Sequence, residues 1–158
     1  MEGLWQRGLI LGIAGFLASC VAGSTSMQAP SNTDLRFLPV DSKVYFKNPI
    51  NVPPHTDRVS LAYDRTVRGL RVTLEIPAAE IDRVIEPGTA FTVEQVDSAR
   101  TPKSRGSCGT TLHLMSPRGL MMQFRVARVS DYGTCLSPTY GDLTSIVTII
   151  VAPPVPID

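Results

Sequence analysis

Apolar and polar residues alternate along most of the chain after Asp34, which is the pattern of β-strands with one buried face. In Asp57–Tyr63 this period of two places Val59, Leu61 and Tyr63 on one face. The alternation predicts strands over Lys43–Lys47, Asp57–Tyr63, Val67–Ile76, Thr89–Val96, Thr110–Met115 and Leu120–Ala127. The segment Leu143–Val151 is apolar at odd and even positions, which predicts a central strand covered on both faces.

The segments between these strands are rich in proline and glycine. Pro53–Thr56 excludes a helix, and Ser116–Gly119 has the composition of a four-residue hairpin turn. Only Pro77–Val84 has helical spacing, with proline at a position suited to a first helical turn. We therefore expect an all-β, mainly antiparallel fold, a small β-sandwich or barrel, with one short helix near residues 77–84.

The N-terminal segment has a different pattern. Arg7 precedes an uncharged apolar stretch, Gly8–Leu17. This length lies within the roughly 7–15 residues of a signal-peptide core, whereas a membrane-spanning helix needs about 20 apolar residues. The stretch therefore predicts export; an uncleaved membrane anchor is the alternative.

The residues that follow are Leu17-Ala18-Ser19-Cys20. This motif resembles the lipobox of bacterial lipoproteins. The resemblance implies cleavage before Cys20, a lipid on its sulfur and an acylated new N-terminus. Because Val21 rather than aspartate follows the cysteine, the resemblance also favours the outer membrane over the inner one. The alternative is an ordinary secretory signal cut near Ala22, which would release a soluble periplasmic protein.

Composition divides the rest of the chain into two parts. Residues 20–33 are small and polar, which is typical of a flexible tether. We expect residues 34–158 to form a single β-rich periplasmic domain with a proline-rich tail from Ala152, which either lies in a partner's groove or frays at its end.

The three cysteines can be assigned once Cys20 is taken as the lipidation site. Cys108 and Cys135 remain, and an even pair in an oxidising compartment predicts a disulfide. Their spacing fits no metal motif. The bridge would hold together the open end of the hairpin whose turn is at Pro117.

The net charge and the histidines argue against several classes of function. The net charge is +1, so no overall field would attract nucleic acid. The two histidines, His55 and His113, belong to no recognisable catalytic motif, and we expect no enzyme activity, cofactor or metal.

One basic loop, residues 98–107, contains Arg100, Lys103 and Arg105 and no acidic residue. It is either a solvated loop or a contact for lipid phosphate, lipopolysaccharide or an acidic partner.

Three stretches, residues 50–61, 71–76 and 86–96, resemble a group of uncharacterised proteobacterial lipoproteins, although Val72 stands where that group has a cysteine. We therefore expect a non-enzymatic, outer-membrane-anchored lipoprotein whose domain faces the periplasm and binds or scaffolds a protein or envelope component. The alternatives are a small inhibitor or ligand-binding lipoprotein acting on a periplasmic hydrolase, an envelope enzyme with an unrecognised site, and exposure on the cell surface.

Overall fold

The computed structural model describes residues 26–63, 69–78, 84–100, 107–129 and 137–154. About half of the described residues lie in β-strands, all of them paired antiparallel, which confirms the predicted all-β fold. The strands are β1 (Met27–Gln28), β2 (Lys43–Phe46), β3 (Ile50–Asn51), β4 (Arg58–Tyr63), β5 (Leu70–Glu75), β6 (Val84–Ile85), β7 (Phe91–Arg100), β8 (Ser107–Met115), β9 (Met121–Val129) and β10 (Val147–Val151). Two 3₁₀ helices, η1 (Leu35–Phe37) and η3 (Tyr140–Leu143), complete the described elements.

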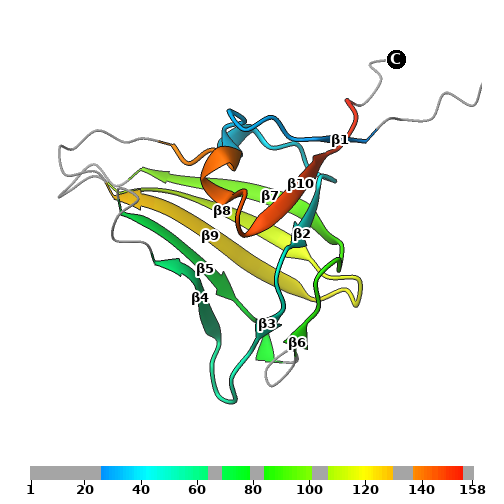
Figure 1. Ribbon diagram of the computed structural model, residues 1–158, viewed down its shortest axis with the longest axis vertical. Helices are drawn as coiled ribbons and strands as arrows, with labels where there is room; N and C mark the ends of the chain where they lie inside the picture. The colour runs from blue at the N-terminus through cyan, green and yellow to red at the C-terminus, as the bar shows by residue number, and fades with distance from the viewer. Residues whose placement is uncertain (1–25, 64–68, 79–83, 101–106, 130–136, 155–158) are drawn as a thin grey trace, which may run out of the picture.

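Eight strands form one sheet in the order β1-β10-β2-β7-β8-β9-β5-β4, and β3 and β6 form a separate pair. The sheet bends where β2 meets β7, because these strands pair at only two positions, Lys43 with Thr92 and Val44 with Phe91. As a result β10 and β2 pass over the broad sheet of β7, β8, β9 and β5, and β4 lies at its far edge (Figure 1). The arrangement is sandwich-like.

Three phenylalanines join the two parts of the bent sheet. The ring of Phe46 on β2 packs edge-on against Phe91 on β7 and Phe124 on β9, with centroid distances of 5.4 and 5.8 Å. All three side chains are buried. Such edge-to-face pairs contribute about 0.5–1.5 kcal/mol each beyond their buried area.

The hairpin turn predicted at Ser116–Gly119 is confirmed. The Gly119 N–H donates to the Ser116 carbonyl at 2.9 Å, and the Leu120 N–H donates to the Ser116 hydroxyl at 3.1 Å. Gly119 has φ of 78°, a left-handed conformation that glycine adopts without steric cost.

The regular alternation predicted for Asp57–Tyr63 places Val59 and Leu61 correctly towards the core but is wrong beyond Leu61. A β-bulge at Leu61 adds one residue to β4, so Ala62, not Leu61, pairs with the buried Val72 of β5, and Tyr63 pairs with Arg71. An inserted residue reverses which positions face the core, and a two-residue period cannot reveal it.

The doubly covered central strand predicted over Leu143–Val151 is also wrong. Leu143 ends η3, and β10 begins only at Val147. Val147 and Ile149 are fully buried, whereas Thr148 and Ile150 on the opposite face are partly exposed. The strand lies next to the edge of the sheet, beside the two-residue β1.

The folded domain begins earlier than Asp34. Met27 and Gln28 pair with β10, Ala29 is buried, and the Gly141 N–H donates to the Ser31 carbonyl at 2.7 Å. Residues 26–33 are therefore part of the fold, and only residues 20–25 of the expected tether lie outside the described chain.

The helix expected near residues 77–84 falls largely on residues 79–83, which lie outside the described chain. Val84 does not belong to a helix, because Val84–Ile85 forms β6 and pairs with β3. In the described part of the chain, we find no helix with the length and apolar character needed to cross a membrane.

One buried polar atom generates a prediction about stability. The Thr110 hydroxyl is buried and has no hydrogen-bond partner among the described residues. Burying an unpaired hydroxyl costs about 1–3 kcal/mol, so we expect Thr110→Val to raise the free energy of unfolding by about 1 kcal/mol, measured by urea denaturation. Thr111→Val, on the opposite face, is the control and should change stability by less than about 0.5 kcal/mol. Equal effects of the two variants would contradict this interpretation.

Candidate functional site

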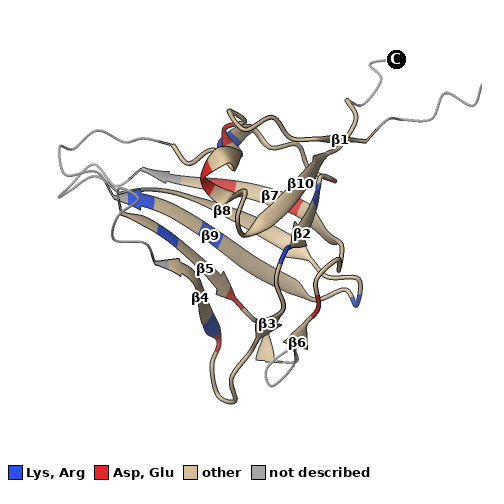
Figure 2. Ribbon diagram, viewed as in Figure 1, with Lys and Arg blue, Asp and Glu red and all other residues tan. Residues whose placement is uncertain are grey.

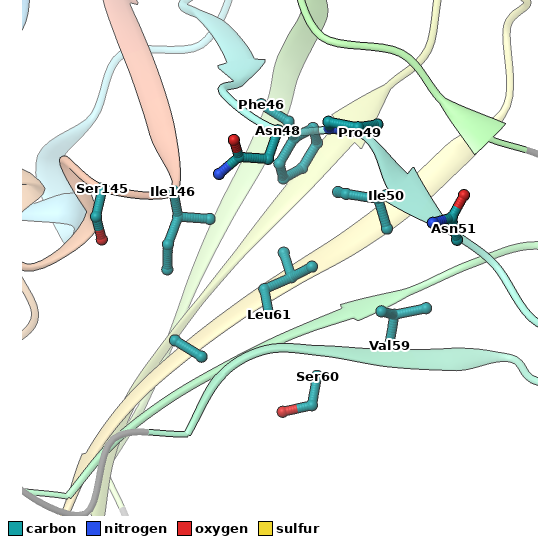
Figure 3. Close-up of a pocket in the computed structure, with 11 residues that line it drawn as sticks. Phe46, Asn48, Pro49, Ile50, Asn51, Val59, Ser60, Leu61, Ser145 and Ile146 are labelled. Atoms are coloured by element: carbon teal, nitrogen blue, oxygen red, sulfur yellow. The ribbon is translucent and has the colours of Figure 1, made fainter.

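A cleft of about 460 Å³ separates β4 from the segment that connects β2 to β3. Figure 3 shows Phe46, Ile50, Leu61 and Ile146 directed towards a common centre, with the Ser60 side chain pointing away from it. The lining residues are Phe46, Asn48, Pro49, Ile50, Asn51, Val59, Ser60, Leu61, Ala62, Ser145 and Ile146.

One wall of the cleft is the segment between β2 and β3, which is free to form it because β2 leaves the large sheet after Phe46. Among the described residues, the last backbone hydrogen bond along this edge runs from the Lys47 N–H to the Ile146 carbonyl, at 2.9 Å. Pro49 has no N–H to continue such a ladder. The chain then pairs with β6 through Ile50 and Asn51 instead of rejoining the large sheet.

The second wall is an edge strand. β4 pairs with β5 on one side and has no strand on its other side among the described residues. The Ile76 N–H donates to the Asp57 carbonyl at 2.8 Å, so Asp57 directs its backbone groups towards β5. Because these directions alternate along an antiparallel strand, the backbone groups of Arg58 and Ser60 point away from β5. The strand therefore presents unpaired donors and acceptors at the edge of the cleft.

The lining is apolar at its centre and polar but uncharged at its rim. The amides of Asn48 and Asn51 and the hydroxyl of Ser145 provide donors and acceptors, and neither amide hydrogen-bonds to another described residue. None of the described lining residues is charged. Figure 2 shows the same contrast, since β3 and β10 carry no charged residue while β4, β5 and β9 do.

Arg58, which precedes Val59 of the cleft lining, is held on the outer face of the sheet. Arg58 Nη2 donates to Glu75 Oε1 at 2.6 Å, and Arg125 Nη2 donates to Glu75 Oε2 at 3.3 Å. Glu75 thus pairs with the guanidinium groups of both Arg58 and Arg125. The arrangement favours an uncharged ligand in the cleft, one with apolar side chains and backbone-like polar groups.

A second polar cluster lies on the outer face of β7 and β8. His113 Nε2 lies 2.7 Å from Asp97 Oδ2, and Gln95 Nε2 donates to Asp97 Oδ1 at 2.7 Å. These hydrogen bonds, that from Gln95 foremost, hold the pKa of the Asp97 carboxyl below its ordinary value of 3.8. Since an ionised carboxylate only accepts, His113 Nε2 carries the hydrogen.

Among the described cross-strand neighbours, this His–Asp pair has no nucleophile of the kind that acyl-transfer chemistry requires. The cross-strand neighbours of His113 are Gln95 and Gln123, two amides rather than a serine or cysteine nucleophile. His55 lies elsewhere, exposed in a turn with φ of 62°. Neither histidine lines the cleft beside β4.

The structure brings together few of the residues singled out from the sequence. Cys108 lies on β8 opposite Arg128, at the open end of the β8–β9 hairpin, because β8 begins at Ser107 and not at Thr110 as predicted. Cys20, Cys135, Lys103 and Arg105 lie outside the described residues, so lipidation and the Cys108–Cys135 disulfide stay predictions. Arg100 ends β7, and its side chain likewise lies outside the described part of the chain.

The cleft residues were missed by sequence reasoning. The only signal available was the Asn48-Pro49 pair, which marks a strand end. No three histidine, cysteine, aspartate or glutamate side chains in the described ranges are grouped so as to hold a metal ion.

The Asp97 cluster generates a prediction that can be measured by titration. Gln95→Ala should raise the pKa of the Asp97 carboxyl towards 3.8, because it removes the main hydrogen bond to the charged form. Carbon-detected NMR of the carboxyl reports this value directly. Gln123→Ala, a glutamine on the same face, should leave the value unchanged.

The same change has a defined effect on stability. A lowered folded-state pKa stabilises the protein above about pH 4, and this contribution is lost as pH falls through the lowered value. The Gln95→Ala protein should therefore lose less stability than the parent between neutral and strongly acidic pH. Identical acid dependence of the two proteins would contradict the assignment.

No protein-family description matches this sequence, and comparison with curated proteins and with solved structures gives no significant similarity.

Proposed function

We propose that the chain is a non-enzymatic outer-membrane lipoprotein, anchored through Cys20, whose domain binds an extended segment of a partner protein along β4. The observation that carries the proposal is the unpaired edge of β4 beside an uncharged cleft. An extended peptide can add to such an edge as a further strand, with main-chain hydrogen bonds providing affinity and side-chain pockets providing specificity.

Three features of the cleft support a peptide rather than a charged small molecule. Arg58 and Ser60 present backbone groups in the alternation that an added antiparallel strand needs. The apolar centre around Phe46 and Leu61 accepts alternate side chains of such a strand. The amides of Asn48 and Asn51 lie on the opposite wall, where they are able to bond the outer backbone edge of the peptide.

Binding rather than catalysis is supported by the described chemical groups. The His113–Asp97 pair has amides as its cross-strand neighbours, and the cleft lining has no ionisable group among its described residues. An uncharged lining does not provide a general acid or base.

A site-specific photo-crosslinker tests this function in the cells that make the protein. Placed at Asn51, which is exposed in the cleft, it should give a discrete adduct with another protein. Placed at Asn32, an equally exposed asparagine near η1, it should not give that adduct. Adducts are detected by electrophoresis and mapped by mass spectrometry.

Two substitutions at Ser60 test whether the partner binds to the backbone edge of β4. Ser60→Pro removes an N–H that points away from β5, so it should abolish the Asn51 adduct while the β4–β5 pairing remains. Ser60→Ala keeps the backbone N–H and should retain the adduct. Circular dichroism confirms that both variants fold. An adduct that survives Ser60→Pro in a folded protein, or that forms equally from Asn32, would overturn the proposal.

A further inference from the structure

We propose that the end of the domain formed by β1, η1 and the loop before β2 lies against the lipid bilayer, with Met27, Phe37 and Val40 in contact with it. This inference rests on the lipidation of Cys20 in the proposed function. It adds an interaction surface, and hence an orientation, that the anchor alone does not specify.

The apolar side chains at this end are the most exposed of the described large hydrophobic residues. The exposed fractions are 66% for Met27, 74% for Phe37 and 55% for Val40, against 49% for Val84 and 40% for Met121. The first three all fall within residues 27–40. Exposed apolar groups that gather near one end mark a contact surface more often than single scattered ones do.

Hydrogen bonds and strand pairing tie these segments to one another. Met27 pairs with Val151, and the next residue, Ala152, donates its N–H to the Ser42 hydroxyl at 3.1 Å. Val40 lies two positions before Ser42, in the turn closed by the Ser42 N–H and the Pro39 carbonyl at 3.3 Å. In Figure 1 β1 and the blue η1 lie at the top of the molecule, while β3, β4 and β6 lie towards the bottom.

The short connection between Cys20 and β1 indicates that the bilayer, and not another protein, covers this apolar surface. The described chain begins at Ser26, six positions after Cys20. At about 3.3–3.6 Å per residue, even a fully extended chain of this length spans only about 20 Å. A lipid on Cys20 therefore keeps β1 near the membrane surface, and this end of the domain is the part that the tether holds there.

The Arg36–Asp34 ion pair next to Phe37 is compatible with a position at the membrane surface. Arg36 Nη2 donates to Asp34 Oδ2 at 2.7 Å, and the guanidinium lies 5.2 Å from the centroid of the Phe37 ring. The hydrogen bond from Arg36 lowers the pKa of the Asp34 carboxyl, so the pair stays ionised and mutually compensated at neutral pH. An aromatic ring beside a compensated charge pair suits the headgroup region of a bilayer.

A tryptophan reporter tests the contact. The chain has a single tryptophan, Trp5, which precedes Cys20 and is removed with the signal peptide under the proposed function. Phe37→Trp and Met27→Trp then place one indole at this end, and Val84→Trp places one at a partly exposed apolar position on β6. Each lipidated protein is reconstituted into vesicles of phosphatidylethanolamine and phosphatidylglycerol with brominated acyl chains.

We expect the bromines to quench the indole emission of the Phe37→Trp and Met27→Trp proteins at least roughly twofold more strongly than that of the Val84→Trp protein, since an interfacial side chain lies about 5–10 Å into the bilayer boundary. Equal quenching in the three proteins would overturn the inference. A concentration-dependent blue shift of the Phe37→Trp emission without vesicles would also overturn it, because a second copy would then cover the face.

The mass of each purified protein separates the two proposals. A polypeptide that begins at Cys20 without added lipid would refute the lipid anchor of the proposed function. A lipidated protein without preferential quenching would refute only the membrane contact.

Discussion

The structure depends on the brief pairing of β2 with β7. Two paired positions join the strands, and β2 then leaves the sheet at Asn48. A longer pairing would have extended one twisted sheet with an exposed apolar face. Because the contact is short, β10 and β2 fold over the broad sheet, and Phe46 packs against Phe91 and Phe124 at the bend.

The short pairing of β2 with β7 also creates the candidate site. The folded-over strands pass over the broad sheet, whereas the outer edge of β4 has no neighbouring strand in the part of the chain that the structure describes (Figure 1). The bulge at Leu61 places an additional apolar side chain beside this uncovered edge, where it packs against the core. Exposed strand edges are sites of aggregation unless they are blocked or occupied, so an edge of this kind is consistent with a strand-like partner. The proposed bilayer contact at β1 and η1 would leave β4 directed towards the periplasm.

Much of the fold is predictable from the sequence, because strands and turns are specified by residues that are close together in the chain. Alternation in segments such as Leu70–Glu75 and Met121–Val129 reports a buried face directly, and Ser116–Gly119 has side chains that specify its turn. Strands of two residues, such as β1 and β3, are too short to show a period. The cleft was not predictable because it depends on strand order and on the bulge at Leu61, which arise from long-range pairing.

The open edge of β4 is the central claim, and amide hydrogen exchange of the isolated domain tests it most directly. The alternating ladder predicts that the amides of Arg58 and Ser60 exchange at rates close to those of an unstructured chain, while the Val59 amide, directed towards β5, is protected. Protection of the Ser60 amide equal to that of Val59 would contradict the account, because the edge would then already be covered.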